Sequence, residues 1–117
     1  MQHNLDFVQL VAEVRPQIKE LSIHEVKLKQ AQKHQFIFID VREDCEWEQG
    51  HLPQAIHIGR GVLERDIHTL GMNKKAEIIL YCGGGFRSIL AAYNLQKMGY
   101  TNVYSMDGGF SGWNSQT

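Results

Sequence analysis

The sequence is poor in the residues that small proteins use as covalent or metal cross-links. Its 117 residues include only two cysteines, Cys45 and Cys82, so a disulfide scaffold is not expected. The six histidines are scattered and show no tight ligand spacing with either cysteine, which argues against a structural zinc site. We therefore expect a fold held together by its hydrophobic core, with no metal and no organic cofactor.

An excess of one charge and a long apolar run are also missing. The 12 Lys and Arg residues against 13 Asp and Glu give a formal net charge of -1, and no basic stripe with interleaved aromatic residues is present, which argues against a nucleic-acid partner. No apolar stretch approaches the roughly 20 residues that span a bilayer. The first residues, Met1 to Asp6, do not resemble a signal peptide. These absences predict a cytoplasmic protein with no membrane partner.

What the chain does contain is an alternation of strand and helix patterns over the length of one domain. A continuous apolar run, typical of a buried parallel strand, predicts a strand at residues 36–39. Further strands are predicted at residues 76–81 and 102–106, with a shorter one at 55–58. Helical patterns predict helices at residues 22–33, 43–49, 62–70 and 88–98. The alternation predicts an α/β fold with a central, mostly parallel sheet flanked by helices.

The first 20 residues form a separate pattern. Apolar residues at Leu5, Val8, Val11 and Val14 have helical spacing, which predicts an amphipathic helix over residues 5–19 that Pro16 ends or kinks. We interpret residues 1–20 as an N-terminal helical extension that packs on the main fold or on a second subunit, and residues 21–117 as the domain itself.

The chemistry is concentrated in the loop of residues 82–87, which we call the Cys82 loop. A buried strand leads into Cys82, and a helix follows, so the loop is predicted at the carboxyl end of the sheet, where α/β folds bind ligands. Gly83, Gly84 and Gly85 allow backbone N–H groups to turn inward around an anion, and the helix N-terminus adds its positive dipole. This cradle favours the thiolate, which is the nucleophilic form of cysteine. It would equally hold a persulfide anion or the oxygens of a donor such as thiosulfate.

Other side chains near this loop have predicted roles. Arg87 binds the donor or holds the loop shape, Phe86 forms part of the pocket wall, and Ser88 caps the following helix. Arg60 is a candidate for attracting an anionic donor. An equally favoured interpretation is that Arg60 is a solvated surface residue with no such role. Cys45 is a candidate resolving thiol, although an incidental cysteine in a short helix is the favoured interpretation.

Four segments in order resemble the rhodanese family: Asp40-Val41-Arg42, then Glu46 to Ala55, then Cys82 to Ser88, then Gly108 to Trp113. The resemblance runs from about Ser22 to Trp113 and implies a three-layer rhodanese-like fold. It also implies a sulfurtransferase in which Cys82 takes sulfane sulfur from thiosulfate or a persulfide and passes it to cyanide or a thiol. Residues 83–88 would bind substrate. One departure is Gln54, which stands where a glycine is common in the family.

Three alternatives to this enzyme stay open. One is a non-catalytic rhodanese-like binding module, which the retained Cys82 and Arg87 disfavour. A second is a persulfide carrier whose acceptor is a protein partner. The third is a phosphatase or arsenate reductase, but four residues separate Cys82 from Arg87, one fewer than in cysteine phosphatases, so the cradle suits a single sulfur atom better than a phosphate.

Overall fold

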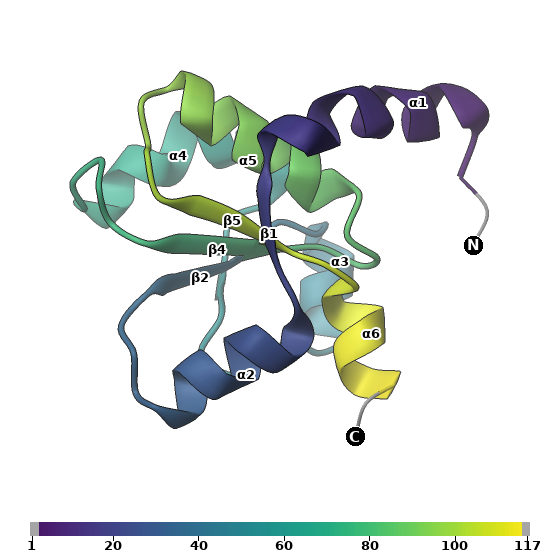
Figure 1. Ribbon diagram of the computed structural model, residues 1–117. Coiled ribbons are helices and arrows are strands. Elements are labelled where there is room, and N and C mark those ends of the chain that lie inside the picture. Colours follow the sequence, from purple (N-terminus) through teal and green to yellow (C-terminus); the bar gives the residue numbers. More distant parts are fainter. Residues whose placement is uncertain (1–2, 116–117) are drawn as a thin grey trace.

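A computed structural model describes residues 3–115 of the chain, and its centre is a five-stranded sheet (Figure 1). The strands are β1 (Lys19–Leu21), β2 (Ile37–Asp40), β3 (Ile56–His57), β4 (Ile78–Tyr81) and β5 (Val103–Met106). The α-helices are α1 (Leu5–Val14), α2 (Ile23–Ala31), α3 (Asp44–Glu48), α4 (Leu63–Asp66), α5 (Arg87–Lys97) and α6 (Gly109–Ser115). Short 3-10 helices are η1 (Arg15–Gln17), η2 (Arg60–Val62) and η3 (Ile67–Leu70).

The sheet has the strand order β1-β5-β4-β2-β3, and every pair in it is parallel. Because parallel strands share a direction, the carboxyl ends of β2, β4 and β5 meet at one edge. The register aligns Asp40 with Tyr81 and Leu80 with Ser105, so Cys82, which follows Tyr81, lies at this edge. The topology alone therefore brings segments from three distant parts of the sequence together.

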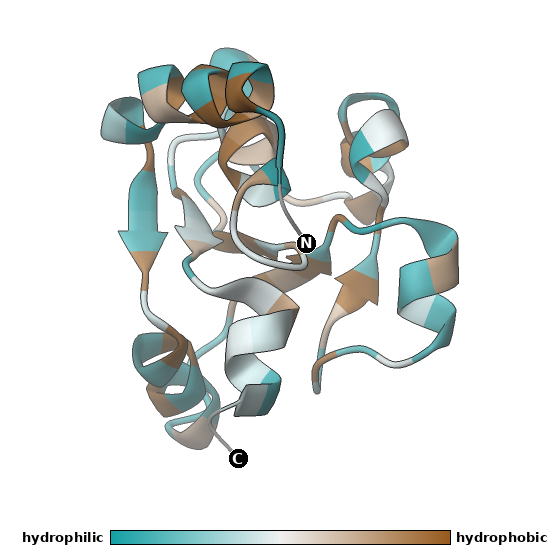
Figure 2. Ribbon diagram, turned by 90° about the vertical axis from the view of Figure 1, so that its right-hand side faces the viewer, coloured by the Kyte–Doolittle hydropathy of each residue, from teal (hydrophilic) through white to brown (hydrophobic). Residues whose placement is uncertain are grey.

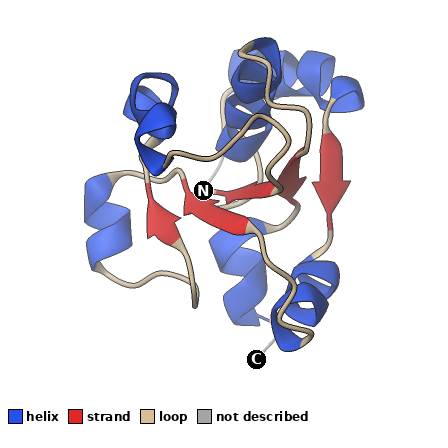
Figure 3. Cartoon of the chain, turned by 90° about the vertical axis from the view of Figure 1, so that its left-hand side faces the viewer, coloured by secondary structure: helices blue, strands red, loops and turns tan. Residues whose placement is uncertain are grey.

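Helices cover both faces of the sheet, as Figures 1 and 3 show. On one face, α1, α4 and α5 pack against alternate strand residues such as Ile78 and Leu80. On the other face, α2 and α6 pack against Ile79 and Tyr81. Strand β4 is buried along its whole length, which explains the continuous apolar run in its sequence. The predicted three-layer α/β fold is confirmed.

The largest correction to the predicted elements concerns residues 15–21. The helix predicted over residues 5–19 ends at Val14, and Pro16 lies in the 3-10 turn η1 because its ring cannot continue an α-helix. The chain then forms the unpredicted edge strand β1, which pairs with β5. Figure 2 draws β1 mostly in the hydrophilic colour, because two of its three residues are charged.

Two further features bear on the predictions. The helix predicted over residues 62–70 is divided into a short α-helix between two 3-10 turns, η2 and η3. Helix α1 packs on α5 of the same chain, and the predicted boundary after residue 20 falls inside β1. The division into extension and domain stays a prediction.

No helix within residues 3–115 is long and apolar enough to cross a membrane.

Candidate active site

Cys82 lies at the point where β4 ends, and its side chain is only 1% exposed. Two backbone N–H groups converge on its sulfur: that of Gly85, with an N to Sγ distance of 3.2 Å, and that of Ser88, at 3.4 Å. Gly85 lies in the turn that leads into α5 and Ser88 in the first turn of α5 itself, so the N-terminus of this helix faces the sulfur. A negative charge on Sγ would therefore be stabilised by hydrogen bonds that are already in place.

Ser88 has a different position from the one predicted. No side-chain hydrogen bond caps α5, because the helix begins one residue earlier, at Arg87. The buried Ser88 hydroxyl instead accepts a hydrogen bond from the Cys82 thiol at 3.5 Å and lies 2.7 Å from the hydroxyl of Ser105 on β5. The prediction of a helix cap at Ser88 is wrong, and the side chain belongs to the surroundings of the sulfur.

The segment after β5 packs against the Cys82 loop and donates hydrogen bonds to its backbone. Phe110 N–H donates to the carbonyl of Cys82 at 2.8 Å, and Ser111 N–H donates to that of Gly83 at 3.0 Å. Gly109 packs so closely that a Cβ atom there would lie 2.4 Å from the Cys82 carbonyl oxygen. Gly85 adopts a φ of +99°, and a Cβ atom on it would lie 3.2 Å from the nitrogen of Gly108. Two glycine-rich segments therefore fit against one another, and this close approach explains Gly85 in one and Gly109 in the other.

Arg87 is held by Glu46 of α3, a partner that the sequence did not reveal. The guanidinium donates from Nη1 to Oε1 at 2.8 Å and from Nη2 to Oε2 at 3.1 Å, in the two-point geometry typical of strong arginine–carboxylate pairs. This hydrogen bonding lowers the pKa of Glu46 to about 2 and raises that of Arg87. The charge of Arg87 is therefore largely neutralised at the mouth of the site.

A cavity of about 340 Å³ opens above the sulfur. Its lining residues are Cys82, Gly84, Phe86 and Arg87 from the loop and its end, Glu46 from α3, and His3 and Phe7 from the N-terminal segment. Phe86 lines this cavity, and its role in substrate binding stays a prediction. His3 and Phe7 were not predicted, because nothing in a helical pattern indicates which distant loop the helix will cover.

Arg60 and Cys45 lie outside this lining. Arg60 follows β3, where its backbone N–H donates to Val41, and its Nε atom is buried with no hydrogen-bond partner among the described residues. Cys45 is exposed and lines a different cavity, of about 410 Å³, together with Gly59 and other residues. The roles proposed for these two side chains stay predictions.

Asp40 and Arg42 form a buried ion pair that braces the neighbouring strand end. Arg42 Nη2 donates to Asp40 Oδ2 at 2.8 Å and to the carbonyl of Gly50 at 2.7 Å. The Tyr81 hydroxyl donates to the same Asp40 oxygen at 2.6 Å, and burial raises the pKa of Tyr81. This network fixes the strand end that immediately precedes Cys82.

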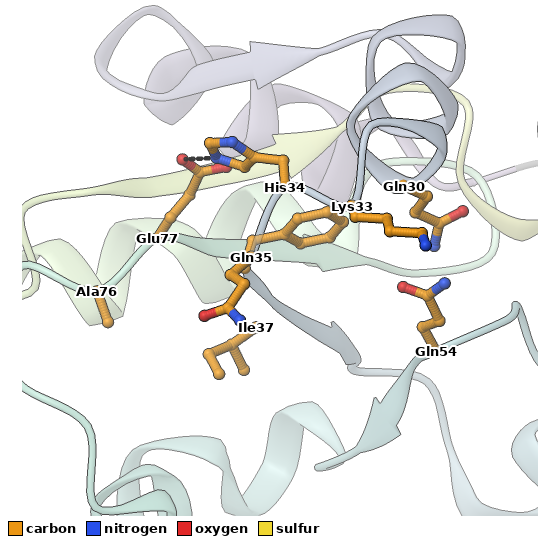
Figure 4. Close-up of a pocket in the computed structure, with 9 residues that line it drawn as sticks. Gln30, Lys33, His34, Gln35, Ile37, Gln54, Ala76 and Glu77 are labelled. Carbon is orange, nitrogen blue, oxygen red and sulfur yellow. Dashed lines mark hydrogen bonds and ion pairs between the residues drawn. The ribbon is translucent and has the colours of Figure 1, made fainter.

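A larger cavity, of about 590 Å³, lies near the opposite edge of the sheet, at the start of β2 and β4 (Figure 4). Its polar groups include a hydrogen bond between His34 and Glu77, at 3.1 Å. Two residues that line it, Lys33 and Gln54, have positive φ angles of 57° and 70°. None of the described residues that line it is a cysteine, so it offers no alternative to Cys82 as a sulfur nucleophile.

Comparison with known proteins identifies the family. The sequence profile of the rhodanese-like domain matches residues 22–116. The putative sulfurtransferase YtwF of Bacillus subtilis (strain 168) is 35% identical over 101 residues, which make up 86% of this chain and 95% of that protein. The putative sulfur carrier protein YrkF of the same bacterium is 33% identical over 100 residues, covering 86% of this chain but 53% of its own length. The chain belongs to the rhodanese-like domain family, and the predicted resemblance is confirmed.

Solved structures agree on the fold. A protein of unknown function from Rhodopseudomonas palustris CGA009, described as a possible tyrosine phosphatase, superposes with a TM-score of 0.83 at 26% identity, covering 99% of this chain and 96% of that one. The human single-domain sulfurtransferase TSTD1 superposes with a TM-score of 0.75 at 22% identity, covering 84% and 96% of the two chains. At that identity the human structure supports the fold alone.

Proposed function

We propose that this protein is a sulfurtransferase that carries sulfane sulfur as a persulfide on Cys82. The observation that carries the proposal is the pair of N–H groups, from Gly85 and Ser88, that converge on Sγ at the floor of a cavity. They would stabilise a thiolate before the reaction and help to hold a persulfide anion after it. Arg87 shapes the loop through Glu46, while Gly84 and Phe86 line the cavity together with Cys82.

The reaction proceeds in two displacements at sulfur. The Cys82 thiolate attacks the outer sulfur of the donor, a new S–S bond forms, and the old bond breaks, with its electron pair leaving as sulfite from thiosulfate or as a thiolate from a persulfide. The acceptor, cyanide or a thiolate, then attacks the terminal sulfur of the persulfide. The second S–S bond breaks and returns its electron pair to Cys82, so no external oxidant or reductant is needed.

The names of the relatives support sulfur transfer and are compatible with two kinds of sulfur acceptor, a small molecule or a protein. One relative is described as a putative sulfurtransferase and another as a putative sulfur carrier. A small thiol or cyanide would accept sulfur in the first case, and a protein persulfide partner would exchange it in the second. The cytoplasmic location and the absence of nucleic-acid and membrane partners stay predictions.

A phosphatase activity is the second candidate, because one similar structure is described as a possible tyrosine phosphatase. Two features of this chain argue against it. Only four residues separate Cys82 from Arg87, and the guanidinium that would have to bind phosphate already binds both oxygens of Glu46. We expect no release of nitrophenol from p-nitrophenyl phosphate by the purified protein.

The test is the intact mass of the purified protein after incubation with thiosulfate and, separately, with glutathione persulfide. We expect a gain of one sulfur atom that cyanide or a thiol removes. Cys82→Ser should abolish this gain, whereas Cys45→Ser, the matched control in a separate cavity, should keep it. Loading that survives in Cys82→Ser and disappears in Cys45→Ser would overturn the proposal.

A further inference from the structure

The N-terminal helix supplies one wall of the cavity above Cys82. His3 and Phe7 line this cavity although both precede residue 22, where the match to the family profile begins. Their rings contact each other, with centroids 5.2 Å apart, and both contact Phe86 of the Cys82 loop, at 4.7 Å from His3 and 6.0 Å from Phe7. Three rings from two distant segments thus form one aromatic wall.

The orientation of this wall is fixed by the core beneath it. Val11 and Val14, on the same helix as Phe7, are buried among the side chains of the main hydrophobic core. The Asn4 side chain caps the helix by accepting a hydrogen bond from Phe7 N–H at 2.8 Å. Phe7 therefore lies on a docked and capped helix, and its ring faces the loop.

The charge in the cavity, like the aromatic wall, favours a ligand with an apolar body over a compact anion. Among the described residues that line the cavity, Arg87 is the one permanent cation, and Glu46 binds that cation at two points. A compact dianion such as thiosulfate would have to compete with Glu46 for Arg87. The cavity volume of about 340 Å³ falls within the range of small-organic-molecule pockets, roughly 300–1,000 Å³.

We infer that the N-terminal helix makes this site selective for organic thiols and persulfides with an apolar body, which would lie on the wall formed by His3, Phe7 and Phe86. The inference rests on the proposed sulfur transfer through Cys82 and specifies its partner. In the transfer step, the thiolate of such a molecule attacks the terminal sulfur of the Cys82 persulfide and forms a new S–S bond. The S–S bond to Cys82 breaks and returns its electron pair to the Cys82 sulfur. The apolar part of the molecule covers the aromatic rings, while water is displaced from them.

The experiment compares two thiol acceptors on protein that has first been loaded with sulfur and checked by intact mass. The probes are benzyl mercaptan, which has an aromatic body, and thioglycerol, which is hydrophilic. We expect kcat/KM to favour benzyl mercaptan, and we expect Phe7→Ala to reduce that preference by roughly ten-fold, the effect of losing an apolar pocket contact. Leu10→Ala, on the same helix but exposed, is the matched control and should keep the preference.

Two further measurements keep the outcome clear. His3→Ala removes a ring from the wall, so it should reduce the preference. Because His3 is exposed and precedes the helix, this variant should not unfold the protein, which a thermal melt checks. Equal use of the two thiols by the unaltered protein, or a preference that survives both Phe7→Ala and His3→Ala, would overturn the inference alone. A protein that gains no sulfur from any donor would overturn the proposed function and this inference with it.

Discussion

At the scale of single residues, Gly109 makes the closest approach to the Cys82 loop. Its φ of +56° lies in the left-handed region, and a Cβ atom there would meet the carbonyl oxygens of Cys82 and Gly83 at 2.4 and 2.8 Å. Backbone atoms cannot move aside as a flexible side chain can. Any other residue at this position must therefore displace the loop that holds the sulfur.

Gly109→Ala should consequently lower the free energy of unfolding by about 3 kcal/mol, from overpacking and left-handed strain together. It should also reduce sulfur loading of Cys82, because the N–H groups around Sγ would shift. Gly61→Ala is the matched control, since nothing lies within 4 Å of a Cβ atom at that position. Urea unfolding and intact mass measure the two effects, and equal stability of the two variants would contradict the prediction.

Gln54, which departs from the family pattern, lies at a position where the backbone conformation favours glycine. It adopts a φ of 70°, which glycine reaches without strain and glutamine does not. Gln54→Gly should therefore raise the free energy of unfolding by up to about 1 kcal/mol, the left-handed strain less the added chain entropy. Gln35→Gly, at an exposed position without a positive φ, should lower it. Thermal melts of both variants check the opposite signs.

At the scale of elements, the sequence predicted what short-range patterns encode. Strands β2 and β4 were predictable because each contains a run of apolar residues, at 37–39 and 78–81. Helix α2 was predictable from its helical pattern, and Ser22 and Glu25 form a capping box at its start, with hydrogen bonds of 2.9 and 3.0 Å. Strand β1 was not predictable, because its pairing with β5 decides its conformation and its three residues carry two charges. The same reasoning explains why α1 was predicted but its place against the Cys82 loop was not.

The docking of α1 can be tested through its buried face. Val11 is 1% exposed and belongs to the core between α1, α5 and the sheet. Val11→Ala should lower the free energy of unfolding by about 2 kcal/mol, because it leaves a cavity that the core cannot fill. Leu10→Ala, at a neighbouring position that is 48% exposed, should change it by less than about 0.5 kcal/mol. Similar urea midpoints for the two variants would show that α1 does not pack as described.

At the scale of the whole molecule, the site depends on contacts between segments far apart in the sequence. Glu46 and Arg87 are 41 residues apart, and Cys82 and Gly109 are brought together only by the parallel order of β4 and β5. A motif can indicate that each residue matters, yet it does not say which residue pairs with which. The Cys82 loop was therefore predicted from sequence, whereas its ion pair, its support and its aromatic wall required the fold.

The Glu46–Arg87 pair makes part of the stability of this assembly dependent on pH. The pKa of Glu46 is about 2 in the folded protein against a usual 4.5, so the pair stabilises the fold fully above pH 4.5 and loses this effect as the pH falls through 2. Because the Glu46 side chain is 34% exposed, solvent screens the pair, and we expect a contribution of about 1 kcal/mol at pH 7.

Glu46→Gln removes the carboxylate while keeping an oxygen that can accept the Glu43 N–H bond at the start of α3. At pH 7 this variant should be less stable than the unaltered protein, and the difference should shrink between pH 4.5 and pH 3. Urea unfolding of both proteins across this range measures it, and a difference that stays constant down to pH 3 would contradict the assignment. The same variant removes the negative charge that neutralises Arg87, so the rate of sulfur loading from thiosulfate should rise relative to that from an aromatic persulfide.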